Sequence, residues 1–217
     1  MNEKLYGYMN WPRIEAIVYG EETAPRDVMG PRITPDGVLI QGFFPGADEV
    51  SVISENKTYV CEKEDEAGYF AVLLPVHKVP KYKFSIKTGE IETESYDPYA
   101  FPCQITEEEE KQFCAGVYYE AYKKLGAHPM EINGVKGTLF AVWAPNAISV
   151  NIAGDFNEWI GRATIMHRMP MSGIFELFVP GVEVGTHYKY EIKVKGGEVL
   201  LKADPYGNSA DHDPEGA

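Results

Sequence analysis

Short apolar runs separated by clusters of turn-forming residues recur along this chain, and the pattern predicts strands. The runs TLFAVWAP, VNIA, IFELFVP and YKYEIKV are apolar throughout or alternate apolar with polar residues, and Gly, Pro, Asn and Asp bound them. Runs of about 4–8 residues bounded in this way are typical of β-strands. Strands at this spacing, without helical periodicity between them, predict antiparallel β-sandwiches of immunoglobulin-like size. The expected fold class is therefore mainly all-β.

The same order of runs occurs twice. FPGADEVSVI is followed by GYFAVLLP, YKFSIK and DPY in the first half, and APNAISVNIA by GIFELFVP, YKYEIKV and DPY in the second. Pro45 and Pro145 are 100 positions apart, whereas Asp97 and Asp204 are 107 positions apart. The growing offset places the additional residues in loops, which tolerate insertions. We expect two tandem immunoglobulin-like β-sandwiches joined by a short helical segment, over residues 22–104 and 128–207.

The segment between the two copies has helical character. In TEEEEKQFCAGVYYEAYKKLGAH, Thr106 followed three residues later by Glu109 is a capping-box signal, and the Glu run suits a solvated helix start. Gly116 allows a break into two short helices. One apolar face is expected from four residues spaced by four, namely Phe113, Val117, Ala121 and Leu125. A helical linker is thus predicted over residues 105–127.

The two ends of the chain complete the expected organisation. WPRIEAIVYG carries Pro12 at an early helical position, which predicts a helical segment within residues 1–21. Residues 208–217 contain ADHDPE, whose carboxylates lack the alternating ligands and glycine of a calcium loop, so they are expected to be solvated. We expect these residues to begin a linker to a further domain.

Composition restricts the classes of function. The chain has 217 residues and a net charge of −13, which disfavours nucleic-acid partners but is neutral toward an uncharged polymer. No apolar run approaches the roughly 20 residues of a membrane span, and the N-terminus has no signal-peptide layout, so no membrane partner and a cytoplasmic location are expected. Three cysteines, Cys61, Cys103 and Cys114, form no CxxC pair and are expected to be reduced.

The sequence offers no catalytic or metal-binding motif. It contains no Gly-rich phosphate loop, no HExxH and no GxSxG. Five histidines are scattered without ligand spacing and are expected to be hydrogen-bonded or solvent-facing: His77, His128, His167, His187 and His212. No catalytic residue, metal or cofactor is therefore predicted in this chain.

Aromatic residues remain as the candidate chemistry. After VNIA, the second copy has the long loop GDFNEWIGRATIMHRMPMS, whereas the corresponding segment of the first copy, SENKTYVCEKEDEA, has no tryptophan. Trp143, inside a strand pattern, is expected in the core. Trp159, in the loop, either plugs the end of the sandwich or offers a flat apolar face to a ligand. Aromatic faces flanked by polar groups suit sugar rings, so a carbohydrate is the favoured ligand.

Several ordered motifs resemble the N-terminal region of bacterial-type 1,4-α-glucan (glycogen) branching enzymes. The motifs are LGAH, FAVWAPNAISVNIAGDFNEW, GIFELFVPG, YKYEI and KADPYGN, and DPYAF in the first copy also looks like the first domain of these enzymes. The second copy resembles a carbohydrate-binding module of family 48. The resemblance implies a parent enzyme of the α-amylase superfamily, glycoside hydrolase family 13, with its active site on a separate (β/α)8 barrel. Such enzymes transfer an α-1,4-glucan segment to a 6-hydroxyl.

The resemblance also implies partners and binding residues. Modules of this type contact glucan through the tryptophan after FN, here Trp159, and through the lysine of the YK-aromatic strand, here Lys189, with Asn157 as a weaker polar candidate. Leu201 stands where a related module has a second tryptophan, so binding is expected to be weak. The expected partners are an α-glucan (glycogen, amylose or malto-oligosaccharide) and the catalytic barrel of the same polypeptide. This chain by itself is expected to be non-catalytic.

Two other readings of the sequence stay open. The same domains occur in debranching and trehalose-forming relatives. A regulatory or adhesive sandwich without an enzyme partner, including a non-enzymatic glycogen-binding module, would show the same strand pattern.

Overall fold

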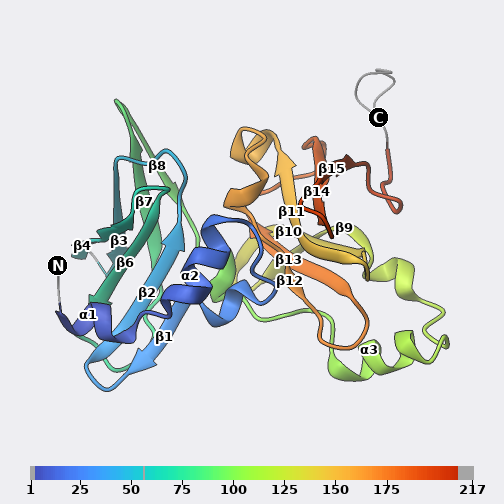
Figure 1. Cartoon of the computed structure of the whole chain (residues 1–217), viewed down its shortest axis with the longest axis horizontal. Coiled ribbons are helices and arrows are strands. Elements are labelled where there is room, and N and C mark those ends of the chain that lie inside the picture. The colour runs from blue at the N-terminus through green and yellow to red at the C-terminus, as the bar shows by residue number, and fades with distance from the viewer. Residues whose placement is uncertain (1–2, 56, 210–217) are drawn as a thin grey trace. The chain divides into compact units, whose positions relative to one another are not determined.

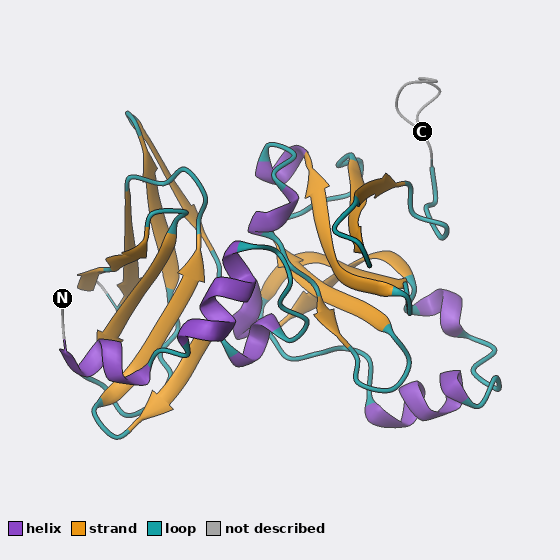
Figure 2. Ribbon diagram, in the orientation of Figure 1, coloured by secondary structure: helices purple, strands orange, loops and turns teal. Residues whose placement is uncertain are grey.

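The computed structural model describes residues 3–55 and 57–209, so most of the expected linker at 208–217 lies outside the described residues. The chain divides into two compact units, residues 1–101 and 102–217. Each unit consists mainly of β-strands with a few short helices (Figures 1 and 2). All the strand pairings of the described residues are antiparallel. The predicted fold class is confirmed.

Unit 1 is a sandwich of two four-stranded sheets. The first sheet has the order β1 (Gly30–Thr34), β2 (Gly37–Phe43), β6 (Tyr69–Leu74) and β5 (Glu62–Asp65). The second has the order β4 (Lys57–Val60), β3 (Glu49–Ser54), β7 (Lys83–Thr88) and β8 (Ile91–Ser95). The inward-facing side chains of the two sheets form the core of the unit.

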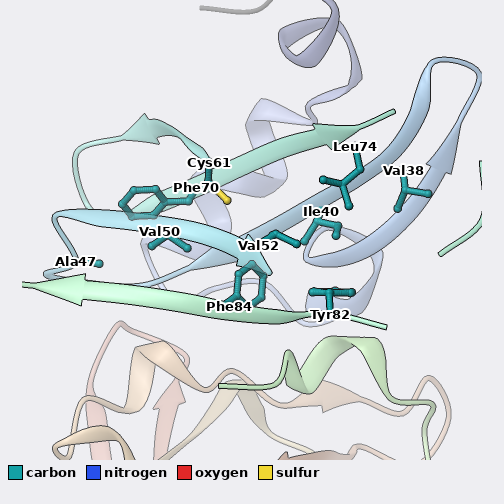
Figure 3. Close-up of a cluster of buried hydrophobic side chains, with 10 residues drawn as sticks. All are labelled: Val38, Ile40, Ala47, Val50, Val52, Cys61, Phe70, Leu74, Tyr82 and Phe84. Carbon is teal, nitrogen blue, oxygen red and sulfur yellow. The ribbon is translucent and has the colours of Figure 1, made fainter. Parts of the chain in front are cut away.

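Figure 3 shows this core. Val38 and Ile40 of β2 lie with Leu74 of β6, and Val50 and Val52 come from β3. All five are at most 1% exposed. β2 is buried along its whole length, whereas β3 and β6 also carry partly exposed or exposed positions. Burial of apolar side chains at this density is the dominant stabilising contribution to such a domain.

Two helices precede the first sandwich, as the N-terminal sequence predicts. They are α1 (Glu3–Tyr8) and α2 (Trp11–Val18), and Pro12 lies in the first turn of α2. Ile14 and Ile17 of α2 are at most 1% exposed, so this helix packs its apolar face into unit 1. Residues 1 and 2, at the start of the predicted helical segment, lie outside the described residues.

Unit 2 repeats the arrangement. One sheet has the order β12 (His167–Arg168), β13 (Ile174–Pro180), β10 (Val135–Trp143) and β9 (Gly126–Ile132), and the other has β11 (Ala147–Gly154), β14 (Tyr188–Val194) and β15 (Val199–Lys202). Asn133 and Gly134 join β9 to β10 with φ values of 53° and 81°. Asn-Gly is the pair favoured for such a two-residue hairpin turn.

Topology confirms the internal repeat and explains its unequal loops. The strands β3, β7 and β8 of unit 1 correspond in order and pairing to β11, β14 and β15 of unit 2. In unit 1, β4 pairs with the free edge of β3. In unit 2, the long loop after β11 returns to that edge, with a bridge between Asn151 and Ile165 and a hydrogen bond from Ile152 N to Thr164 O of 3.1 Å. The tryptophan-bearing loop therefore takes the place of a strand.

The segment between the copies is partly as predicted. Thr106 caps α3 (Glu107–Cys114), and both hydrogen bonds of the predicted capping box with Glu109 are present. The helix ends before Gly116, whose φ is +72°, and a short 3-10 turn follows at Ala121–Lys123. The break at Gly116 is therefore confirmed.

Two other predictions for this segment are wrong. Val117 is 49% exposed, because the helix stops before it and no continuous four-residue stripe forms. The Glu run is not wholly solvated, since Glu110 is 1% exposed. Its Oε1 accepts hydrogen bonds from Met171 N and Ser172 N, both of 2.8 Å. Phe113, Ala121 and Leu125 do pack with the hydrophobic cluster of Ile105, Ala141 and Ile174.

Candidate functional site

The loop after β11 has an unusual backbone conformation. Asp155–Asn157 forms a 3-10 turn, and the next two residues, Glu158 and Trp159, have φ values of 54° and 62°. The left-handed region is uncommon for residues other than glycine, above all for bulky ones, and costs on the order of 1–3 kcal/mol. Trp159 N donates a 3.0 Å hydrogen bond to Gly154 O, which holds this conformation. Backbone strain at an exposed aromatic residue marks the loop as a candidate binding site.

The side chain of Trp159 is 44% exposed, so it does not plug the sandwich. Its Nε1 donates a hydrogen bond of 3.1 Å to Oδ1 of Asp155. Oδ2 of the same carboxylate accepts a hydrogen bond from His187 N and lies 3.1 Å from His187 Nδ1. These contacts, above all the bond from the His187 backbone, lower the pKa of Asp155. The carboxylate thereby connects the loop to the start of β14.

Asn157 stabilises the loop from within. Its Oδ1 accepts a hydrogen bond of 2.9 Å from Gly154 N, while Nδ2 donates to Ile152 O at 2.7 Å and to Thr164 Oγ1 at 2.8 Å. Both amide protons are therefore used inside the protein. The geometry indicates that this side chain fixes the loop rather than donating to a ligand.

Lys189 lies on β14 beside the loop. It is directly opposite Ala153 of β11, two residues after His187, and its side chain is half-buried. The neighbouring Tyr190 points to the other side of the strand, into the core, and is 0% exposed. Because side chains alternate along a strand, Lys189 and Glu191 belong to the outer face of the sheet.

The same outer face continues onto β15 and carries an apolar residue. Leu201 is opposite Glu191 and is 56% exposed. Glu191 Oε1 accepts a hydrogen bond of 2.9 Å from Asn151 Nδ2, on the other side of β14. Asp155 and Glu191 thus both hold protein groups. The outer face of β14 and β15 carries the Lys189 ammonium group and the apolar Leu201, and the Trp159 ring is exposed on the loop.

Trp143 lies elsewhere in unit 2 and corrects the expectation that it is a core residue. It is 53% exposed, at the end of β10, and its Nε1 donates a hydrogen bond of 2.9 Å to Ser172 O. Its ring packs edge-on against Phe113 with centroids 5.9 Å apart. Its place at the end of the strand decides this outcome, because β10 is buried on both faces from Gly137 to Val142 and only its ends are exposed.

Sequence reasoning missed Asp155 and His187 as parts of the site. Asp155 was visible within GDFNEW and His187 immediately precedes the YKY run. Neither has a spacing that predicts contact, because they are 32 residues apart and meet only through the pairing of β11 with β14.

Within residues 3–55 and 57–209, no cluster of three or more His, Cys, Asp or Glu side chains is arranged to hold a metal ion. Within the same residues, no helix has the length and apolar character needed to cross a membrane. None of the three cysteines forms a disulfide, and burial raises the pKa of the Cys61 thiol to about 12.

Comparison with known families assigns both units. Residues 10–99 match the N-terminal domain of the alpha-1,4-glucan branching enzyme GlgB. Residues 124–207 match carbohydrate-binding module 48, the isoamylase N-terminal domain. The second match includes the loop of Trp159 and strand β14.

Curated relatives give the same result. The 1,4-alpha-glucan branching enzyme GlgB of Saccharophagus degradans is 41% identical over 208 residues, which are 94% of this chain and 28% of that protein. The GlgB of Agrobacterium fabrum is 36% identical over 218 residues, 99% of this chain and 30% of that protein. The chain therefore spans less than a third of the length of these relatives.

Solved structures resemble it only distantly. A pullulanase complexed with maltotetraose, from Anoxybacillus sp. LM18-11, has a TM-score of 0.35 and 18% identity, and the match covers 84% of this chain and 25% of that one.

Proposed function

Because the chain has the sequence of the N-terminal region of the 1,4-alpha-glucan branching enzyme family, we propose that it binds α-glucan. Its second unit matches a family-48 carbohydrate-binding module, and we assign the binding to the outer face of β14 and the loop of Trp159. Trp159 supplies the platform for a sugar ring. Lys189 donates to a sugar hydroxyl. Asn157 contributes by holding the loop in shape.

The observation that carries this proposal is the half-exposed Trp159 ring held by a hydrogen bond from Nε1 to Asp155. A ring that is already oriented loses little conformational freedom when it stacks on a ligand. Pyranose rings have apolar C–H faces edged by hydroxyls, which complement an indole face with polar neighbours. The negative net charge of the chain does not oppose an uncharged ligand.

We expect the affinity of this site to be weak. One stacked ring and one or two hydrogen bonds can supply about 4 kcal/mol, which corresponds to a dissociation constant of about 1 mM. Leu201, in place of a second aromatic ring, adds apolar contact without a stacking partner. Titration of the chain with maltoheptaose, followed by tryptophan fluorescence, measures this affinity.

Trp159→Ala tests the proposal. The variant should remain folded, because the ring is half-exposed, and should lose measurable binding to maltoheptaose. Thermal melting of both proteins controls for unfolding. An unchanged binding curve in a folded Trp159→Ala protein would contradict the assignment.

For the whole protein we propose the branching activity of the relatives, in which an α-1,4-glucan segment is transferred to a 6-hydroxyl. We assign the chemistry to a (β/α)8 barrel of the same polypeptide and propose a cytoplasmic location for the protein. The proposed domain boundaries are residues 22–104 and 128–207 for the sandwiches. Isolation of the full-length gene product and assay of its branching activity on amylose test this proposal; a debranching product would favour the alternative.

A further inference from the structure

Unit 1 has a groove along α2 that the proposed function does not use. It is partly open to solvent, with a volume of about 350 Å³, and its walls include Trp11, Pro12 and Val18 of the helix and Tyr19 after it. Asp65, at the end of β5, and Glu15 add two carboxylates to the lining. Cavities of this size are at the lower end of those that hold small ligands.

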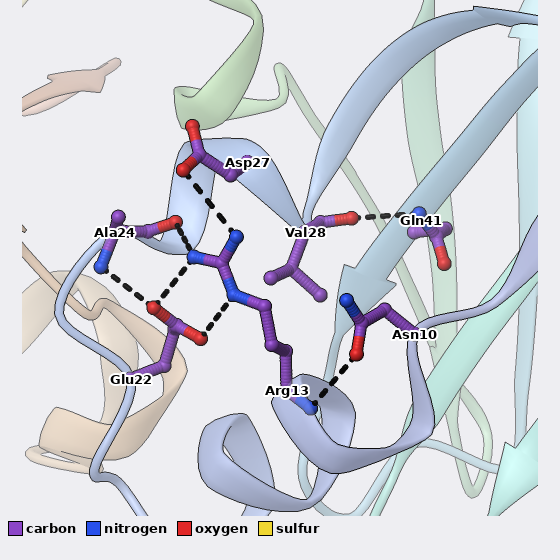
Figure 4. A network of polar contacts seen from close by, with 7 residues as sticks. All are labelled: Asn10, Arg13, Glu22, Ala24, Asp27, Val28 and Gln41. Carbon is purple, nitrogen blue, oxygen red and sulfur yellow. Dashed lines mark hydrogen bonds and ion pairs between the residues drawn. The ribbon is translucent and has the colours of Figure 1, made fainter.

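A network of polar contacts anchors α2, the helix that lines the groove, and Figure 4 shows this network. Arg13 of α2 donates hydrogen bonds from Nε and Nη2 to the two carboxylate oxygens of Glu22, each of 2.8 Å, and a third from Nη2 to Ala24 O of 3.0 Å. Glu22 is 6% exposed. Asn10 caps the helix through Arg13 N. A bidentate pair of this kind fixes α2 and the side chains that it presents.

The aromatic residues are placed to contact a ligand. Tyr19 is 64% exposed at the end of α2. Trp11 is half-buried and packs against Tyr6, with ring centroids 5.1 Å apart. Tyr6 itself is 46% exposed, so the aromatic surface extends beyond the cavity.

The polar groups of the groove restrict the ligand. Carboxylates accept hydrogen bonds and repel anions, so Asp65 and Glu15 disfavour phosphorylated ligands, as does the net charge of −13. Asp65 is fixed in position, because its Oδ1 accepts a 2.7 Å hydrogen bond from Ala67 N. An uncharged ligand with apolar ring faces and several hydroxyl donors satisfies both the aromatic walls and the acidic rim.

We propose that this groove is a second saccharide-binding site, which takes a short segment of α-glucan. The inference rests on the proposed function for the identity of the ligand, but not on the site of Trp159. A glucan polymer presents many equivalent segments. Two weak sites that engage one polymer at the same time bind it more tightly than either site does by itself.

The three tryptophans of the chain make the test specific, because one lies in each region of interest: Trp11 in the groove, Trp159 in the loop and Trp143 outside both. The indole N–H signals of the ¹⁵N-labelled 217-residue chain are assigned with Trp→Phe variants and followed during titration with maltoheptaose. The signals of Trp11 and Trp159 should shift with separate binding curves. The chemical shift of the Trp143 indole N–H should not change during the titration.

Variants of the groove separate this inference from the proposed function. Tyr19→Ala should weaken the binding reported by Trp11 about fivefold, the loss expected for one stacked ring, and leave the Trp159 curve unchanged. Glu15→Gln preserves the shape of an exposed side chain and should weaken the binding reported by Trp11 less than Tyr19→Ala does. Tyr119→Ala is the matched control, since Tyr119 is 84% exposed and belongs to neither site.

Each outcome is decisive. If maltoheptaose shifts the Trp159 signal and leaves the Trp11 signal constant, the second site is contradicted and the proposed function stands. A shift of Trp11 alone supports the groove and contradicts the assignment of Trp159. Titration with tetramethylammonium tests the competing ligand class, and a saturable shift of Trp11 by this cation, with none by maltoheptaose, overturns the assignment of the groove to glucan.

Discussion

The hydroxyl of Tyr82 donates a hydrogen bond of 2.5 Å to Oδ2 of Asp97. The second unit has the same contact, since Tyr188 donates one of 2.5 Å to Oδ2 of Asp204. These residues are the first tyrosine of YKF or YKY and the aspartate of DPY in each copy. The motifs recur together because they are the two halves of one contact.

The other carboxylate oxygen closes the turn at the end of each copy. Oδ1 of Asp97 accepts from Tyr99 N at 2.8 Å, and Oδ1 of Asp204 accepts from Tyr206 N at 2.8 Å. The aspartate therefore holds its own turn and the start of a strand at the same time. This role requires a short acceptor with two oxygens, and explains the aspartate in both copies.

Tyr82→Phe is expected to destabilise unit 1 by about 2 kcal/mol, because it removes a hydrogen bond to a buried carboxylate. Asp97 is 2% exposed and cannot recruit water in compensation. Tyr188→Phe should cost about 1 kcal/mol or less, since Asp204 is partly exposed and keeps a 3.1 Å hydrogen bond from Tyr190. Urea unfolding of the two variants measures the difference, and equal losses would contradict this explanation.

The stability of unit 1 should depend on pH through Asp97. Burial raises the pKa of this carboxyl from 3.8 to about 6. Below about pH 4 the group is protonated in both the folded and the unfolded chain, and its contribution to stability is complete. That contribution falls as the pH rises through 6, because the unfolded chain releases its proton first, and the total loss is on the order of 3 kcal/mol.

Asp97→Asn tests this dependence. The difference in unfolding free energy between wild type and variant should change between pH 4 and pH 7 and stay constant above that range. Urea unfolding at each pH, followed through the Trp11 indole signal, reports on unit 1, because Trp143 and Trp159 belong to unit 2. A difference that is independent of pH would show that Asp97 titrates normally.

Glu110→Ala should destabilise unit 2 by about 3 kcal/mol. The variant leaves two backbone N–H groups and the Ser172 hydroxyl without their acceptor, and Glu110 is buried. Glu107→Ala is the matched control from the same helix, because its 2.7 Å ion pair with Lys111 is exposed and its loss should change the stability much less. Thermal or urea unfolding distinguishes them. Similar losses for both would contradict the larger contribution assigned to the buried contacts of Glu110.

Asp155→Ala should release the Trp159 ring without unfolding the domain, since Asp155 is 51% exposed. Maltoheptaose binding at Trp159 should weaken about fivefold, the effect of having to immobilise one side chain on binding. Asp155→Asn, which retains an acceptor for Nε1, should keep most of the affinity. Glu158→Ala serves as the control in the same loop. The line width of the Trp159 indole signal, measured without ligand, should change only in Asp155→Ala; an unchanged line width there would exclude a positioning role.

The purified chain should leave the iodine spectrum of amylose unchanged. Retaining glycoside transfer needs two carboxyl groups about 5 Å apart facing the substrate, whereas Asp155 and Glu191 are engaged with His187 and Asn151. A heat-inactivated sample is the control. A change in the spectrum, after exclusion of contaminating enzyme, would contradict the assignment of the chemistry to a separate domain.

The elements of secondary structure and the internal repeat could be predicted from the sequence, because they depend on residues close together along the chain. The pattern of apolar and polar residues predicts the strands, and the repeated order of these strands predicts two sandwiches. The pair Thr106 and Glu109 predicts the start of α3. Each of these signals acts within a few residues or through a repeated pattern. The loop of Trp159 could also be identified, because an insertion relative to the first copy is visible in the sequence.

Tertiary structure decided which side chains are buried and which meet. Glu110 is buried and Trp143 is exposed, although their types suggest the reverse, because α3 docks through Glu110 onto Met171 and Ser172 whereas Trp143 lies at the end of β10. Asp155 meets His187 only through the pairing of β11 with β14. Burial and contact between distant residues depend on packing, which local periodicity does not encode.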